Sequence, residues 1–258
     1  FYPSEGSYTA ELIVTTVEGC SDTISETVMI YPLPVADFTF TEECVGTPSM
    51  FTDSSTISTG AIVDWSWDFN NGNTSMNQNP SELYATDGTY FVSLVVTSDF
   101  NCSSTSIQSV NVWPLPTADF TAPSVCLNTP TQFTNSSSVS SGTNVSYQWD
   151  FGDGSPIDTN LNPIHTYLVD SNAYNVELIV TTDRGCMDTI VNPVIVYAVP
   201  VVSFSADSLM GCTPVIVNFF DSTVIANGSG NPLLWSWDFG NGQTSSLQDP
   251  QGIVFTNT

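Results

Sequence analysis

An internal repeat is the feature of this sequence that most restricts the fold it can adopt. Each repeat contains a Trp-Asp-Phe segment, and the tryptophans Trp67, Trp149 and Trp237 recur at intervals of roughly 82 to 88 residues. Proline-rich segments and strand-like segments recur in step with them. A fixed period of this kind indicates tandem structural units. A unit of this length is small for a domain but large enough to fold alone.

The phase of the repeat predicts four segments. We expect the C-terminal part of a domain at 1–33, complete domains at 34–115 and 116–199, and the N-terminal part of a domain at 200–258. The first and last segments together make one further repeat. We therefore expect this sequence to be part of a longer array.

Alternating hydrophobicity predicts strands rather than helices. Apolar and polar residues alternate along the segments that begin near Tyr8, Tyr90 and Tyr174, and a period of two marks a strand that is buried on one face. The predicted buried residues include Ala10, Leu12, Val14, Val92, Leu94, Val96, Val176, Leu178 and Val180. Asn-Gly and Asp-Gly pairs between such runs suit tight turns. Seven or so short strands per repeat predict an antiparallel sandwich.

The charge balance excludes several functions. The chain carries 26 acidic residues against one basic residue, Arg184, and its formal net charge is −25. Nucleic-acid binding needs lysine and arginine to displace counterions from phosphates, so we expect no nucleic-acid partner. Lysine-dependent chemistry is excluded as well. We expect no membrane insertion in this segment, because it lacks a run of 18 apolar residues.

Three motifs of the second complete repeat resemble a known family. They are WDFGDG at 149–154, NPIHTY at 162–167 and AYNVELIV at 173–180, and together they resemble the polycystic kidney disease (PKD) domain. The resemblance implies an all-β fold of tandem immunoglobulin-like antiparallel β-sandwiches. The proline-containing joints are short and semi-rigid, so we expect the sandwiches to be arranged as a rod. The added paired cysteines are similar to those of large surface and gliding adhesin-type proteins of Bacteroidetes.

His165 is the only histidine and so the only candidate general base near neutral pH. The aligned residue of the preceding repeat is Glu82, and in the family match His165 belongs to a structural strand motif. No arrangement of nucleophile, base and orienting group can be assembled around it. We therefore expect a protein that is not an enzyme and that needs no cofactor.

Asp150 and Asp153 form a candidate calcium site, because Ca²⁺ prefers six to eight oxygen ligands. Some PKD domains bind calcium, but the second segment has asparagines at Asn70 and Asn71. The alternative is that Asp150 and its equivalents, Asp68 and Asp238, accept backbone hydrogen bonds and hold a turn.

The tryptophans of the repeated segments admit two interpretations. They could form a platform on which sugars stack, or they could fill the sandwich core, where a large aromatic residue of a central strand usually lies. We expect the core for the set, which comprises Trp65, Trp67, Trp149, Trp235 and Trp237.

The six cysteines fall into two series. Cys44, Cys126 and Cys212 follow the first strand of a repeat, whereas Cys20, Cys102 and Cys186 follow the strand of the alternating segment. In an immunoglobulin-like order these positions lie at opposite poles, roughly 25–30 Å apart at about 3.3 Å per residue, whereas disulfide-bonded Cα atoms lie within about 7 Å.

We therefore predict an interdomain disulfide between Cys44 and Cys186. The other four cysteines are expected to have partners outside the 258 residues. Pairing within each repeat, as between Cys44 and Cys102, remains the alternative if the strand order differs.

Exposed hydroxyl groups are candidate modification sites. Four positions fit an Asp-Ser/Thr pattern that is similar to the O-glycosylation motif of Bacteroidetes: Thr23, Thr189, Ser208 and Ser222. Unmodified polar residues at the surface are the alternative interpretation.

These observations favour a non-enzymatic structural segment of a long extracellular surface protein, forming the stalk or filament of an adhesin or appendage. Its expected partners are neighbouring repeats of the same chain and other copies in a filament. Two alternatives stay open. One is an array of glycan- or calcium-binding modules in a secreted multidomain protein, and the other is a surface-lattice or sheath protein.

Overall fold

The structure is a computed structural model that describes residues 4–169, 173–225 and 234–256. Every regular element of these described residues is a β-strand. The prediction of an all-β fold is therefore confirmed.

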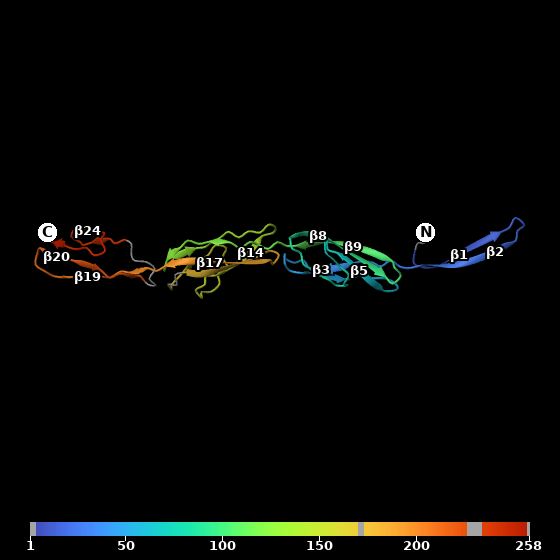
Figure 1. Cartoon of the computed structure of the whole chain (residues 1–258), viewed down its shortest axis with the longest axis horizontal. Helices are drawn as coiled ribbons and strands as arrows, with labels where there is room; N and C mark the ends of the chain where they lie inside the picture. Colours follow the sequence, from blue (N-terminus) through green and yellow to red (C-terminus); the bar gives the residue numbers. More distant parts are fainter. Residues whose placement is uncertain (1–3, 170–172, 226–233, 257–258) are drawn as a thin grey trace. The chain divides into compact units, whose positions relative to one another are not determined.

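The chain divides into two compact units. Figure 1 labels strands of both units and colours them by their place in the sequence. The first unit comprises Phe1–Leu115 together with Val139–Gly142 and Asp183–Cys186. The second unit comprises Pro116–Ser138, Thr143–Thr182 and Met187–Thr258. Each unit holds one complete sandwich and one smaller group of strands.

The sandwich of the first unit has two antiparallel sheets. One sheet has three strands in the order β3-β4-β7, and the other has four in the order β6-β5-β8-β9. The strands are β3 (Phe38–Phe40), β4 (Ser49–Asp53), β5 (Ile62–Asp68), β6 (Thr74–Ser75), β7 (Ser81–Glu82), β8 (Gly88–Ser98) and β9 (Ser103–Val112).

The core of this sandwich follows the alternation in the sequence. Val92, Leu94 and Val96 of β8 are fully buried, because successive side chains of a strand point to opposite faces. They pack with Trp67, which is also fully buried. Trp65 is half-buried, and its indole nitrogen donates a hydrogen bond to Asp53.

The sandwich of the second unit repeats this design. Its longest sheet has the order β11-β17-β16-β14, and two short antiparallel pairs, β10-β13 and β12-β15, complete it. The bounds are β10 (Phe120–Thr121), β11 (Val125–Cys126), β12 (Pro130–Gln132), β13 (Thr134–Asn135), β14 (Asn144–Asp150), β15 (Ile164–Thr166), β16 (Ala173–Thr182) and β17 (Met187–Tyr197). Trp149 is fully buried. The core interpretation of Trp67 and Trp149 is therefore confirmed.

The first unit also contains a long hairpin. It pairs β1 (Gly6–Thr15) with β2 (Ser21–Ile30). Leu12 and Val14 were predicted to be buried but are 60% and 58% exposed. That prediction is wrong for the described structure, because no second sheet of the described residues covers the apolar face of this hairpin.

The second unit ends in a group of short antiparallel pairs between 200 and 255. The pairs are β18-β22, β19-β21, β20-β25 and β23-β24. Their bounds are β18 (Pro200–Val201), β19 (Phe204–Ala206), β20 (Val215–Val217), β21 (Phe219–Asp221), β22 (Val224–Ile225), β23 (Trp237–Asp238), β24 (Thr244–Ser245) and β25 (Ile253–Phe255). The described part of this region contains no equivalent of the long strands β8 and β9.

A search of the described residues for a helix long and apolar enough to cross a bilayer finds none.

Candidate functional site

The two cysteine series meet at one place in the first unit. Cys44 and Cys186 form a disulfide with their Cα atoms 5.7 Å apart. This is the pair named from the sequence, and Cys102 is not joined to Cys44. Cys44 forms a parallel bridge with Trp113, just after β9, and the amide of the next residue, Val45, donates a hydrogen bond to the Trp113 carbonyl.

An aromatic contact accompanies this disulfide. The guanidinium carbon of Arg184 lies 4.3 Å from the centre of the Trp113 ring. A cation over an indole ring contributes roughly 0.5–1 kcal/mol at an exposed site. The Arg184 Nε atom also lies 3.8 Å from a carboxylate oxygen of Asp183. Arg184, the only lysine or arginine of the chain, therefore lies beside the Cys44–Cys186 disulfide.

Residues at the equivalent positions are also in contact earlier in the first unit. The rings of Tyr31 and Phe100 stack with their centres 4.0 Å apart and an angle of 8° between their planes. In the repeat, Tyr31 is equivalent to Trp113 and Phe100 is equivalent to Arg184. Sequence reasoning missed this pairing. The sequence contains one sign of it. Phe100 and Arg184 each lie two positions before a turn cysteine, and Tyr31 and Trp113 each begin a proline-containing segment, with the same spacing in both repeats.

The remaining cysteines carry no disulfide in the described residues. Cys20, Cys126 and Cys212 are exposed, and Cys102 is half-buried. Cys126 forms a parallel pair with Tyr197, which matches the parallel bridge between Cys44 and Trp113. The first-strand cysteines of the two complete sandwiches thus occupy the same local setting.

The aspartate of the Trp-Asp-Phe segment accepts a backbone hydrogen bond in three repeats. Asp68, Asp150 and Asp238 each accept a hydrogen bond from the backbone amide two residues later, at 2.8, 2.8 and 2.9 Å. The interpretation that these residues hold a turn is therefore confirmed. Within the described ranges no group of three or more His, Cys, Asp and Glu residues is placed to hold a metal ion.

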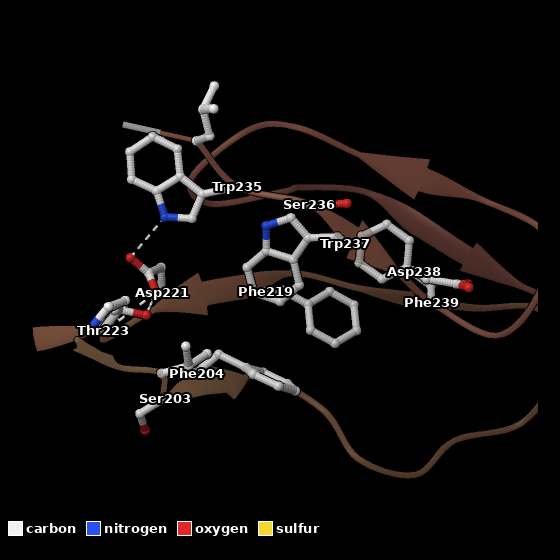
Figure 2. Close-up of a pocket in the computed structure, with 13 residues that line it drawn as sticks. Ser203, Phe204, Phe219, Asp221, Thr223, Trp235, Ser236, Trp237, Asp238 and Phe239 are labelled. Atoms are coloured by element: carbon white, nitrogen blue, oxygen red, sulfur yellow. Dashed lines mark hydrogen bonds between the residues drawn. The ribbon is translucent and has the colours of Figure 1, made fainter. Parts of the chain in front are cut away.

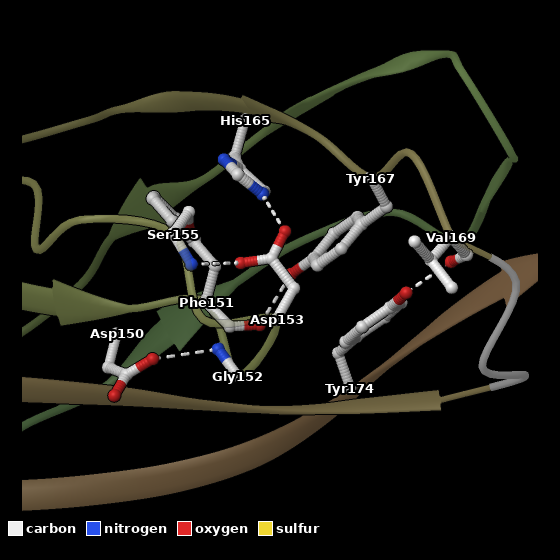
Figure 3. A network of polar contacts seen from close by, with 9 residues as sticks. All are labelled: Asp150, Phe151, Gly152, Asp153, Ser155, His165, Tyr167, Val169 and Tyr174. Atoms are coloured by element: carbon white, nitrogen blue, oxygen red, sulfur yellow. Dashed lines mark hydrogen bonds and ion pairs between the residues drawn. The ribbon is translucent and has the colours of Figure 1, made fainter.

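Asp153 and His165 form a pair at the same turn (Figure 3). His165 Nε2 lies 2.8 Å from Asp153 Oδ2, and the imidazole stacks on Phe151 with the ring centres 4.1 Å apart. Partial burial acts to raise the pKa of Asp153, but hydrogen bonds from Ser155 and His165 outweigh it. The pKa of Asp153 therefore lies below its ordinary value of 3.8.

This pair is not arranged for nucleophilic catalysis. The backbone amide of Ser155 donates to Asp153, so the carboxylate lies between the serine and the histidine. A catalytic triad needs the histidine between the nucleophile and the acid. Among the described contacts, no hydroxyl or thiol group is hydrogen-bonded to His165.

In the preceding repeat, a glutamate and two asparagines replace the histidine–aspartate pair. Glu82 replaces His165, and its Oε1 atom accepts hydrogen bonds from the side-chain amides of Asn71 and Asn73 at 2.8 and 2.6 Å. In both repeats these side-chain contacts join the turn after the Trp-Asp-Phe segment to the strand that carries His165 or Glu82. The position therefore serves to hold the turn in both repeats.

The candidate modification sites differ in accessibility. Thr23, Thr189 and Ser222 are exposed, whereas Ser208 is half-buried and its hydroxyl donates to the Met210 carbonyl.

Comparison with known proteins identifies a family that this chain matches. The model of the PKD domain matches residues 32–112 and 113–196. The pre-pro-metalloprotease PrtV of Vibrio cholerae serotype O1 is 32% identical over 159 residues, which cover 61% of this chain and 17% of that protein. The chain therefore spans less than a fifth of the length of that curated relative.

Two solved structures of single domains are also similar. The crystal structure of the PKD1 domain of PrtV from Vibrio cholerae is 39% identical, with 31% of this chain and 96% of that chain covered and a TM-score of 0.30. The PKD1 domain of Epp from Vibrio anguillarum is 32% identical, with coverages of 31% and 93% and a TM-score of 0.30. The two family matches cover more than half of this sequence, and the chain belongs to the PKD domain family with two consecutive copies.

Proposed function

We propose that this chain is a non-enzymatic structural segment of an extracellular surface protein, and that its tandem PKD domains bear load in the stalk or filament of an adhesin or appendage. Disulfides persist in oxidising environments outside the cytosol, and the Cys44–Cys186 bond supports that location. The use of His165 and Asp153 to hold a turn, rather than to activate a nucleophile, supports a role without catalysis.

The observation that carries the proposal is the connectivity of the disulfide. It joins residues that are 142 positions apart, one from each of the two PKD segments. A force applied to the two ends of the chain passes from Cys44 through the sulfur atoms to Cys186. The intervening residues, which include most of both sandwiches, are then excluded from extension.

Stretching single molecules of the 258-residue chain tests this proposal. Because an extended chain spans at most about 3.6 Å per residue, the intact disulfide shortens the fully extended length by 142 residues, or on the order of 500 Å. Reduction of the disulfide, or the Cys44→Ser substitution, restores that length. Cys102→Ser removes a cysteine without a disulfide and serves as the matched control, with no change in extended length expected. Equal extended lengths for the oxidised chain and for Cys44→Ser would refute the load-bearing role of the disulfide.

The PrtV similarity supports a second candidate, an accessory segment of a secreted enzyme. The two candidates differ in where the native protein is found. Antibodies raised against this chain label intact cells if it belongs to a surface stalk, and they detect the protein mainly in the culture medium if it belongs to a released enzyme.

A further inference from the structure

The turn after the Trp-Asp-Phe segment of the first sandwich, the one in the first unit, contains the dipeptide Asn71–Gly72. Both residues are exposed, and Gly72 has a φ angle of 94°. An asparagine loses its side-chain amide most readily when glycine follows it, because glycine has no Cβ atom to hinder approach to its backbone nitrogen. This exposed turn therefore contains the residue pair that most favours deamidation.

The reaction needs water and no other reagent. The backbone nitrogen of Gly72 attacks the Cγ atom of Asn71 and gives up its proton, which forms a five-membered succinimide ring. The bond between Cγ and Nδ2 breaks, and Nδ2 leaves with that proton as ammonia. Water then adds to either ring carbonyl and breaks its bond to nitrogen, which leaves aspartate or isoaspartate at 71.

The fold fixes both ends of the Asn71 side-chain amide. Its Nδ2 atom donates a hydrogen bond to Glu82 Oε1 at 2.8 Å, and its Oδ1 atom accepts one from the Asn73 backbone amide at 3.0 Å. Glu82 lies on β7 and is only 9% exposed, so the sandwich holds the acceptor in place. Asn71 must give up both hydrogen bonds to close the ring and release Nδ2. We therefore expect the reaction to be slow in the folded chain.

The product does not suit the same surroundings. Aspartate at 71 brings a carboxylate oxygen to the place of Nδ2, which lies 2.8 Å from Glu82 Oε1. Two carboxylates that share a site resist ionising together, and the burial of Glu82 strengthens their repulsion. Isoaspartate also adds a methylene group to the main chain of the turn. Either product is therefore expected to destabilise the turn.

The second sandwich, the one in the second unit, shows what an aspartate at this position requires. Asp153 is equivalent to Asn71, and it faces His165 instead of a glutamate (Figure 3). Each sandwich thus has one carboxylate in the pair: Glu82 in the first and Asp153 in the second.

A third turn of this kind follows Asp238 and Phe239, which are labelled in Figure 2. Asn241 is equivalent to Asn71, and its side-chain amide donates to the Val254 carbonyl at 3.0 Å. The printed contacts of these three turns place no carboxylate opposite another. Conversion of Asn71 would create such a pair.

We propose that Asn71 is a modification site controlled by folding. The folded first sandwich protects it from deamidation, and unfolding of the sandwich allows its conversion to aspartate or isoaspartate. The acidic product faces Glu82 when the chain refolds, so the turn is less stable than before. Residue 71 thereby records that the sandwich has been open. This inference goes beyond the proposed function and does not depend on it.

The test incubates the 258-residue chain at neutral pH in native buffer and, in parallel, in enough urea to unfold the first sandwich. Mass spectrometry of peptides measures conversion of the amide to an acid. Conversion at Asn71 is expected to be at least about tenfold faster in urea, because the folded chain reacts only when the turn opens locally. Asn73 is the internal control. It also donates to Glu82, but the branched side chain of Thr74 hinders attack by the following nitrogen.

The converted chain is then separated by its additional negative charge and returned to native buffer. Its first sandwich is expected to have lost amide hydrogen-exchange protection relative to the unconverted chain. Because the unconverted chain comes from the same urea sample, it controls for the exposure to urea.

Substitutions test the carboxylate pair without the reaction. Asn71→Asp is expected to unfold the first sandwich at a lower urea concentration, and the addition of Glu82→Gln is expected to recover most of that loss, because one carboxylate remains in the pair. Asn70→Asp is the matched control. It adds the same charge to the same turn, but its side chain contacts the Phe91 amide and not Glu82, so only a small change is expected.

Three outcomes would overturn the inference. The first is conversion at Asn71 that is no faster in urea than in native buffer. The second is a converted chain with the same hydrogen-exchange protection as the unconverted chain. The third is a loss of stability in Asn71→Asp that Glu82→Gln does not reduce.

Discussion

The sandwich at 113–196 and the region at 200–255 have the same aromatic residues in the same arrangement but differ in what covers them. Phe133 and Trp149 lie 5.6 Å apart, and their equivalents Phe219 and Trp237 lie 5.7 Å apart. Trp149 is fully buried, whereas Trp237 is only half-buried. The short strands and turns therefore set the ring geometry locally, and the last long hairpin of a repeat supplies the burial.

The largest predicted effect concerns the two tryptophans. Trp149→Ala is expected to lower the local free energy of unfolding by about 3–5 kcal/mol, as large-to-small substitutions in a core do. Trp237→Ala is expected to cost less than half as much in the single chain. Amide hydrogen exchange resolved by mass spectrometry measures each region separately.

The measurement is made on the 258-residue chain at a concentration at which light scattering gives the mass of a single chain, 27.8 kDa. Equal losses at the two positions would contradict the comparison, because they would show that the core at 200–255 is already closed in the single chain.

A smaller effect is predicted at a glycine that both regions share. Gly152 and Gly240 have φ angles of 74° and 71°, and alanine in this conformation costs about 1–2 kcal/mol. A Cβ atom on Gly152 would also lie 2.4 Å from the Asn175 carbonyl oxygen, whereas one on Gly240 meets nothing within 4 Å. Gly152→Ala is therefore expected to cost at least about 1 kcal/mol more than Gly240→Ala, since overpacking adds about 1–3 kcal/mol.

The preceding sandwich provides the control for this glycine. Asn70 occupies the equivalent position with a φ angle of 59°, and its side chain accepts a hydrogen bond from the Phe91 amide. Asparagine tolerates this conformation better than alanine does. Gly152→Asn is expected to unfold at a higher denaturant concentration than Gly152→Ala. The reverse order would mean that the positive φ angle does not limit this position.

The contrast between the two regions also shows what the sequence can predict. Alternation identified the apolar face of each long strand, and it did so correctly for Leu94 and Leu178, which are fully buried. It failed for Leu12, because a pattern along one strand says which side is apolar and nothing about what lies against it.

The joint was predictable in part. The pole positions of an immunoglobulin-like order named Cys44 and Cys186, and this is the pair that the structure contains. The stacking of Tyr31 on Phe100 and of Arg184 over Trp113 was not predicted. These contacts depend on how two distant turns are rotated toward each other, and an arginine in one joint and a phenylalanine in the other share no sequence pattern.

The smallest predicted effect is a difference in acid sensitivity. The pKa of Asp153 is lower in the folded chain than its ordinary value of 3.8, so the unfolded state binds more protons as the pH falls through this range. The stability that this carboxylate contributes is therefore fully present above about pH 4 and is lost as the pH falls below 3.8 toward the folded pKa. Asp153→Asn is expected to flatten the fall in stability of the sandwich at 113–196 between about pH 4 and pH 2.

The region at 200–255 already has an amide at this position, because Asn241 replaces Asp153 and donates to the Val254 carbonyl. In this region the pKa of Asp221 is lowered by a hydrogen bond from Thr223, despite the opposing effect of burial. We expect Asp221 to contribute to the acid sensitivity of the region, and replacing Asp153 leaves Asp221 unchanged. Hydrogen exchange measured against pH in one sample should therefore show a change only at 113–196 when Asp153 is replaced. An equal change in both regions, or none in either, would mean that the Asp153–His165 pair does not govern the acid response of its sandwich.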